Sequence, residues 1–191
     1  LYILSILLYR GDFMNLKKDK IISSILIFGL CFLFHFVYDL IPSCITAIFF
    51  PVNESIWEHQ KLMFTSVVMY SIIDYIILNK CNIKYNNFFT ALFVSSITII
   101  PIFLILYLPI YYKIGSKMWL NLSIMAIAVI ISQIISYFIL KAKNFKLFNN
   151  ISFILLIISY IILAYLTYKP IKCELFFDPM EEKYGINNYN V

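Results

Sequence analysis

The chain is poor in charge. Only 13% of its 191 residues are charged, whereas 62% are hydrophobic and the mean hydropathy is +0.88. Soluble domains carry about 25% charged residues, so this composition excludes a soluble surface. The sequence therefore predicts an all-α integral membrane protein, a single helical bundle with the lipid bilayer as its partner and no separate soluble domain.

Glycine and arginine are also scarce, which argues against nucleotide chemistry. Gly11, Gly29, Gly115 and Gly185 lie far apart, so no Gly-rich phosphate loop or dinucleotide fingerprint can form. The only arginine is Arg10, so an arginine clamp for phosphate is absent from the rest of the chain. The net charge of +5 comes mainly from lysines near the ends of apolar runs. Membrane topology and anionic headgroups explain these lysines without nucleic acid or nucleotide as a partner.

The four cysteines show no CxxC spacing. Cys31, Cys44, Cys81 and Cys173 therefore exclude a zinc knuckle and a thioredoxin motif. In the topology derived below, Cys44 and Cys173 share the outer side, so a disulfide between them stays open.

The first thirteen residues fit poorly with the rest. Arg10-Gly11-Asp12 can be encoded by codons that contain a ribosome-binding sequence, and one further codon separates them from Met14. Richness in Ile, Lys, Asn, Tyr and Phe indicates an AT-rich bacterial genome. We hypothesise that the natural start is Met14 and that residues 1–13 are a translated leader; a short amphipathic or disordered N-terminus is the alternative.

Five apolar runs are long enough to cross a bilayer, which takes about 20 residues. They make residues 14–168 a five-helix membrane bundle, and residues 169–191 are a polar C-terminal tail that is too hydrophilic to cross again. The predicted spans are residues 21–40, 56–78, 88–108, 118–140 and 151–168.

The third and fourth spans carry two local signals. Pro101 predicts a kink in the third span, and Pro109 predicts the start of a loop over residues 109–117. Small residues at four-residue spacing predict that the two spans pack closely. These small residues are Ala91, Ser95, Ala128, Ser132 and Ser136.

The placement of lysines predicts the orientation. With the N-terminus inside the bacterial cell membrane, the inner segments hold Lys17, Lys18, Lys20, Lys80, Lys84, Lys141, Lys143 and Lys146. The outer segments hold Lys61, Lys113, Lys117, Lys169, Lys172 and Lys183. Residues 51–61 and the C-terminus would then lie outside together.

Residues that carry chemistry cluster at that outer end. His35 and Asp39 are four residues apart and so share a helix face, while Glu54, Glu58 and His59 begin the second span at a similar depth. Ionisable groups in a span usually face a bundle interior or a cavity. The sequence predicts a multi-pass membrane protein of unassigned biochemical activity, with this His/Asp/Glu cluster at the outer leaflet. A sharper hypothesis makes these five the candidate catalytic residues of a metal-dependent hydrolase or transferase that acts on a lipid or peptide at the membrane interface. The candidate ligands of a divalent metal are His35, Asp39, Glu58 and His59, with Glu54 and Asp178 as accessory groups.

A purely structural role is the first alternative. Ser55-x-x-Glu58 has the form of a capping box, in which both side chains satisfy free amides at the helix start. His35 and Asp39 could pair only with each other. Because residue 55 is Ser, His59 belongs to neither an HExxH nor an HxxEH motif.

A small proton- or ion-coupled transporter is the second alternative. Asp74 lies toward the inner end of the second span, where it could reach Lys80. Proton passage between Asp74 and Asp39 would need a polar path, for which Gln133 and Asn121 are the available side chains.

Two segments resemble a known family. His35-Phe36-Val37-Tyr38-Asp39, followed by Phe50-Pro51-Val52-Asn53-Glu54-Ser55-Ile56-Trp57-Glu58-His59, is similar to small bacterial multi-pass membrane proteins grouped as a domain of unknown function. Phe177-Asp178-Pro179 and Tyr184-Gly185-Ile186 resemble the C-terminal signature of that family. The resemblance extends from about Lys20 onward. It implies a membrane location and no particular activity.

Overall fold

The structure is a computed structural model that describes residues 14–186, so the leader hypothesis for residues 1–13 lies outside the described residues. Five long helices dominate it: α2 (Leu16–His35), α5 (Ile56–Lys80), α6 (Phe88–Ile114), α7 (Met118–Lys141) and α8 (Lys146–Tyr168). Two short helices, α3 (Val37–Leu40) and α4 (Cys44–Phe49), lie between α2 and α5. The tail contains η2 (Glu174–Phe176), β1 (Phe177–Asp178) and β2 (Lys183–Tyr184).

The predicted all-α bundle of five spans is confirmed. Five helical segments, counting α2 and α3 together, contain 23 to 27 residues and are apolar enough to cross a membrane. At a rise of 1.5 Å per residue, 23 residues extend about 34 Å, which exceeds the roughly 30 Å hydrocarbon core. Many large apolar side chains are exposed along these helices, as on Leu33, Ile105 and Phe138. Exposed apolar surface of this kind is what a membrane-embedded protein presents to lipid.

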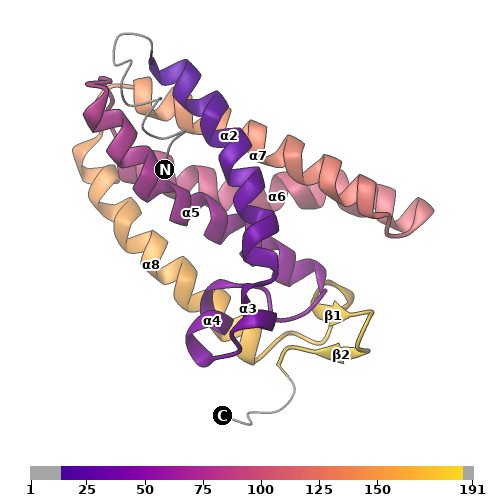
Figure 1. Cartoon of the computed structure of the whole chain (residues 1–191). Helices are drawn as coiled ribbons and strands as arrows, with labels where there is room; N and C mark the ends of the chain where they lie inside the picture. The colour runs from indigo at the N-terminus through magenta and orange to yellow at the C-terminus, as the bar shows by residue number, and fades with distance from the viewer. Residues whose placement is uncertain (1–13, 187–191) are drawn as a thin grey trace.

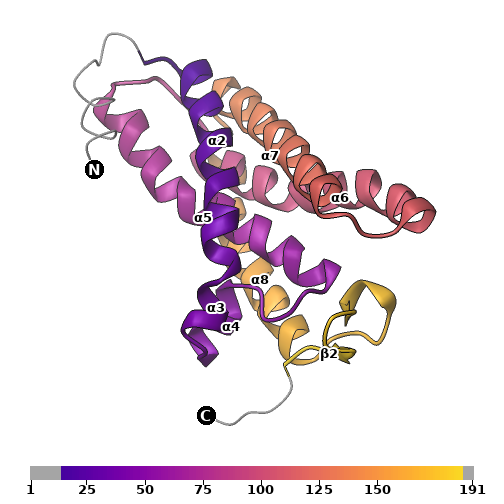
Figure 2. The ribbon, with the colours of Figure 1, turned by 45° about the vertical axis from the view of Figure 1, so that its right-hand side comes forward.

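Helix α5 is the central element, since a larger share of it is buried than of any other span. It packs against α2 and α6, while α7 packs against α2 and α6, and α8 against α6. The paired helices α6 and α7 reach away from the bundle to one side, so their connecting loop lies far from α8 in both views (Figures 1 and 2).

The small residues of α6 and α7 lie where they were expected. These two helices make the most extensive contact of any pair, and all five small side chains are buried. Small side chains allow the two backbones to approach closely, and their hydroxyls bond to carbonyls of their own helix.

Helix bounds differ from the prediction at several ends. Helix α6 continues through both Pro101 and Pro109 to Ile114, and it ends at Gly115, which has a φ of +74°. A proline removes one backbone donor, and packed neighbours tolerate that loss in membrane helices. Helix α2 begins at Leu16 because the Asn15 side chain accepts a hydrogen bond from the Lys18 amide at 3.0 Å. Helix α8 likewise starts five residues earlier than expected.

The tail folds back onto the residues that precede α5. Strands β1 and β2 pair antiparallel, the rings of Phe176 and Trp57 stack at 4.7 Å, and Asn53 donates to the Gly185 carbonyl at 3.1 Å. A Cβ at Gly185 would lie 2.9 Å from Pro170 Cγ, at a φ of +64° that favours glycine. The tail and residues 51–61 therefore share one end of the bundle, as the topology requires.

The four cysteines are all free, so Cys44 and Cys173, both exposed, form no disulfide in the described structure.

Candidate metal centre at the end of α2 and α5

Both histidines come from helix ends that meet. His35 is the last residue of α2, and the chain then turns at Phe36 before α3 begins. His59 lies in the first turn of α5, whose N-cap is Ser55. Residues 36–54 return the chain to the same end, so that the two imidazole rings lie 5.3 Å apart and nearly perpendicular.

Glu54 lies between the two rings. Its Oε1 is 3.6 Å from Nε2 of His35, and its Oε2 is 3.6 Å from Nε2 of His59. Among residues 14–186, these three side chains form a group whose ligand atoms all lie within 4.8 Å of one another. Two imidazole nitrogens and a carboxylate oxygen thus face a common point.

The distances between the Glu54 oxygens and the two imidazole nitrogens can be compared with those expected around a metal ion. At 3.6 Å, an imidazole nitrogen and a carboxylate oxygen are too far apart for a direct hydrogen bond. Two ligands of a tetrahedral zinc ion, each at about 2.1 Å from the metal, lie about 3.4 Å from each other. Ligand atoms within 4.8 Å of one another can be joined by one metal ion.

The tautomer of His59 is fixed by its own helix. Its Nδ1 lies 2.9 Å from the Ser55 carbonyl oxygen, which can only accept, so Nδ1 carries the proton. The lone pair is then on Nε2, the atom that faces Glu54. Metal-binding histidines usually hold their second nitrogen in this way. His35 is less constrained, because its Nδ1 has no hydrogen-bond partner in the described structure.

The tail holds the Glu54 backbone in place. Asp178, which is buried, accepts a hydrogen bond from the Glu54 amide at 3.1 Å. Its other oxygen accepts from the amides of Met180 and Glu181, at 2.8 and 3.3 Å. Asp178 was expected as an accessory group, and this geometry makes it a positioning residue for Glu54 rather than a ligand.

Glu58 lies apart from the two histidines. Its carboxylate is buried against Lys61 at 2.6 Å and accepts hydrogen bonds from the Thr167 hydroxyl at 2.8 Å and the Val52 amide at 3.1 Å. The expected capping box is half formed, because Ser55 accepts from the Glu58 amide whereas the Glu58 side chain turns to Val52. Both Glu58 oxygens thus face Lys61, Thr167 and Val52, and the carboxylate is not part of the group formed by His35, Glu54 and His59.

Asp39 is likewise outside the group formed by His35, Glu54 and His59. The turn at Phe36 separates Asp39 from His35, so the two residues do not share one uninterrupted helix face. Asp39 lies exposed on α3.

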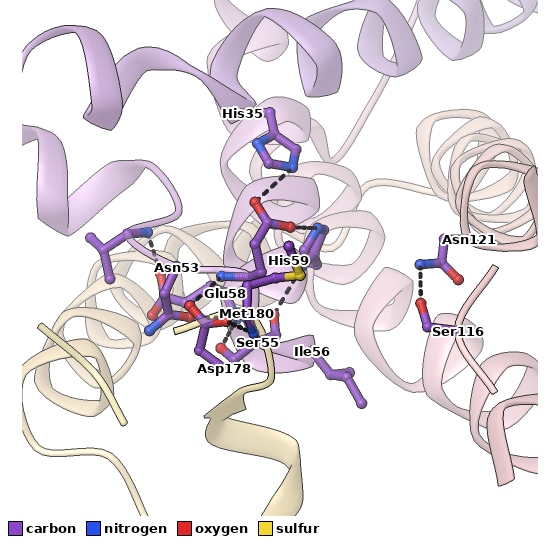
Figure 3. Close-up of polar contacts among 12 residues, drawn as sticks. His35, Asn53, Ser55, Ile56, Glu58, His59, Ser116, Asn121, Asp178 and Met180 are labelled. Atoms are coloured by element: carbon purple, nitrogen blue, oxygen red, sulfur yellow. Dashed lines mark hydrogen bonds and ion pairs between the residues drawn. The ribbon is translucent and has the colours of Figure 1, made fainter. Parts of the chain in front are cut away.

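The polar residues that a proton path through the bundle would need do not lie together. Asp74 pairs with Lys20 at 2.5 Å rather than with Lys80. A cavity of about 10 Å³ beside Asp74 is lined in part by Gln133, but neither Asp39 nor Asn121 lines it. Asn121 instead donates to Ser116 near the loop between α6 and α7, at 3.2 Å (Figure 3).

Replacing Asp178 with alanine should release Glu54. The variant removes the acceptor for the Glu54 amide and the turn that closes β1 onto β2. We expect faster cleavage of the tail by trypsin at Lys183 and a roughly tenfold loss of Zn²⁺ affinity, because outer partners of a metal site typically contribute 10- to 100-fold. Equal cleavage rates and affinities in the variant and the parent protein would refute this role. The exposed Glu174, changed to Gln, is the control.

Comparison with known proteins gives one result. The sequence of residues 10–186 matches a family described as a family of unknown function, DUF6512. No curated protein and no solved structure matches the chain. Since the match covers most of the sequence, the chain belongs to this family of unknown function, DUF6512.

Proposed function

We propose that this protein is a metal-dependent hydrolase that acts at the membrane surface, with a divalent cation held by His35, Glu54 and His59. The observation that carries the proposal is the convergence of two Nε2 atoms on one carboxylate, each at 3.6 Å. Glu54 thus takes the ligand position that the spacing of residues had suggested for Asp39 and Glu58.

Zinc is the metal that this ligand set favours. Two imidazoles and one carboxylate are a set that catalytic zinc sites use, with a fourth position open to water or substrate. The group is partly open in the way such a site requires, since the side chain of Glu54 is 46% exposed and those of His35 and His59 are 28% and 29% exposed. A closed structural site would instead supply four protein ligands.

Other residues of the chain have separate roles around the proposed metal. A bound metal supplies a polarised water at neutral pH. Ser55 fixes the tautomer of His59, and Asp178 fixes Glu54. Glu58 is not assigned the role of general base, because its carboxylate is buried against Lys61, Thr167 and Val52.

The surroundings of the site support a lipid substrate. Phe36, Leu40 and Ile41 follow His35 directly and are 56%, 77% and 63% exposed. In the membrane these side chains lie next to acyl chains, while Glu54 faces the headgroup region. The ester or phosphate linkages of a phospholipid would therefore lie at the depth of the metal. The lysine distribution supports placing this end on the outer face of the bacterial cell membrane.

The proposal is tested with the purified chain in phospholipid nanodiscs. After treatment with a chelator and reloading with Zn²⁺, we expect release of fatty acid or headgroup from phospholipid, and none from the chelated protein. His59→Ala should release nothing after reloading. Asp39→Asn, which changes an exposed carboxylate outside the group, should match the parent protein.

Three results would overturn the proposal: no release from lipid or peptide by Zn²⁺-loaded protein, release that persists with chelator, or equal release by His59→Ala. Transfer of the acyl or phosphoryl group to an added alcohol, in place of water, would assign the same site to a transferase. Release from a peptide and not from lipid would change the substrate class only.

A further inference from the structure

A second group of charged residues lies at the opposite end of the bundle from His35. Asp19 and Lys20 belong to the first turns of α2, and Asp74 comes from α5, six residues before that helix ends at Lys80. The exposed fractions of the three residues are 1%, 5% and 7%. Buried ionisable groups in a membrane helix are costly, so such a group calls for a physical explanation.

The ammonium group of Lys20 contacts the carboxylates of both Asp19 and Asp74. Lys20 Nζ lies 2.5 Å from Asp74 Oδ2 and 3.2 Å from Asp19 Oδ2. The two acids also interact with each other. With all three groups ionised, this buried set would carry a net charge of −1.

Among residues 14–186, no other charged side chain forms an ion pair with Asp19, Lys20 or Asp74. The other polar groups that α2 and α5 place near Asp74 are the hydroxyls of Ser23, Tyr70 and Ser71. Helices α6 and α7 contribute apolar and uncharged polar side chains to the cavity beside Asp74, including Ser95, Gln133 and Ser136. An uncompensated buried charge costs several kcal/mol, which a bound proton would remove.

The hydrogen bonds differ between the two acids. Asp74 receives Lys20 at 2.5 Å and Ser23 at 3.4 Å. Lys20 Nζ lies 3.2 Å from Asp19 Oδ2, but neither Asp19 oxygen accepts a hydrogen bond of good geometry from the described residues. Such donors stabilise the ionised form of a buried carboxylate. Of the two acids, Asp19 is therefore better placed to hold a proton.

We propose that Asp19 and Asp74 form a proton-binding site, in which one proton is shared by the two acids and resides mainly on Asp19. Two carboxylates that contact the same ammonium group repel each other, which disfavours ionisation of both at once. The cavity of about 10 Å³ next to Asp74 is large enough for about one water molecule, with Gln133 and Ser136 as polar partners. The site is independent of the metal centre, because the two groups share no residue.

Infrared spectroscopy of the whole protein in lipid nanodiscs tests the site. A protonated carboxylic acid has a C=O stretching band that a carboxylate lacks. At neutral pH we expect one such band, and we expect Asp19→Asn to remove it. Asp74→Asn should also remove the whole band, because Lys20 then balances Asp19 alone. Asp39→Asn, an exposed acid of the same type, should leave the band unchanged.

Each alternative result counts against the site. Absence of the band from the parent protein, or its persistence in either cluster variant, would overturn the proposal. Disappearance of the band in Glu58→Gln would place the proton on Glu58 instead. Thermal melting checks that the variants fold. Asp19→Asn should have the same melting temperature as the parent protein, because the amide resembles the neutral acid.

Discussion

Replacing Lys61 with methionine should lower the free energy of unfolding by about 3–5 kcal/mol, the usual cost of removing one partner of a buried ion pair. The Lys61 ammonium is fully buried and makes three short contacts, with Glu58 at 2.6 Å and with Thr167 and the Ala47 carbonyl at 2.8 Å each. Without it, Glu58 is left charged and buried. Because these contacts join α4, α5 and α8, the change should loosen the whole end of the bundle. The free energy of unfolding of the variant and the parent protein is compared in mixed detergent micelles.

A double variant separates charge from packing. Glu58→Gln combined with Lys61→Met removes both charges and keeps the side chains near their original volumes, so it should recover most of the stability that Lys61→Met loses. If the single variant is as stable as the parent protein, the ion pair does not hold these helices together. If the double variant is no better than the single one, lost hydrogen bonds to Thr167 and Ala47 explain the effect instead.

Replacing His59 with alanine should weaken Zn²⁺ binding by more than about 100-fold. The change removes a proposed direct ligand, and loss of outer partners alone already weakens metal sites by about 10- to 100-fold. Isothermal titration of the chelated protein with Zn²⁺ measures the affinity. Stability should change little, because the His59 side chain is partly exposed and the hydrogen bond that it makes, to the Ser55 carbonyl, stays within its own helix.

Asp39→Asn is the matched control for that titration. It removes a carboxylate near the same end of the bundle but outside the group formed by His35, Glu54 and His59. We expect unchanged Zn²⁺ affinity. Equal affinities for His59→Ala and the parent protein, or a loss in Asp39→Asn, would show that the metal is bound elsewhere.

Most of the bundle could be predicted from the sequence, because five long apolar runs are direct signals of membrane helices. Helix ends were harder. Pro109 suggested a loop, yet α6 continues to Ile114 because a membrane helix can lose one donor when neighbours pack around it. The fold of the tail was not predicted, since β1 and β2 have only two residues each and depend on contacts with Asn53 and Trp57.

The site was predicted in part. Both histidines and Glu54 were among the candidates, because ionisable residues are rare in this chain and cluster at one end. The role of Glu58 depends on Thr167, more than 100 residues away, and local spacing carries no information about that contact. The turn at Phe36 separates His35 from Asp39 and had no signal such as Pro or Gly. Lys20 was assigned to the interface, and its burial against Asp74 required the packing of α2 on α5.

X-ray absorption at the zinc K-edge, on purified protein with one equivalent of Zn²⁺, tests the metal centre most directly. We expect two imidazole nitrogens and at least one oxygen at about 2.0–2.2 Å, and loss of the imidazole scattering when His35 and His59 are both replaced by alanine. A spectrum of oxygen ligands alone, or one that the double replacement leaves unchanged, would show that His35, Glu54 and His59 do not form a metal site.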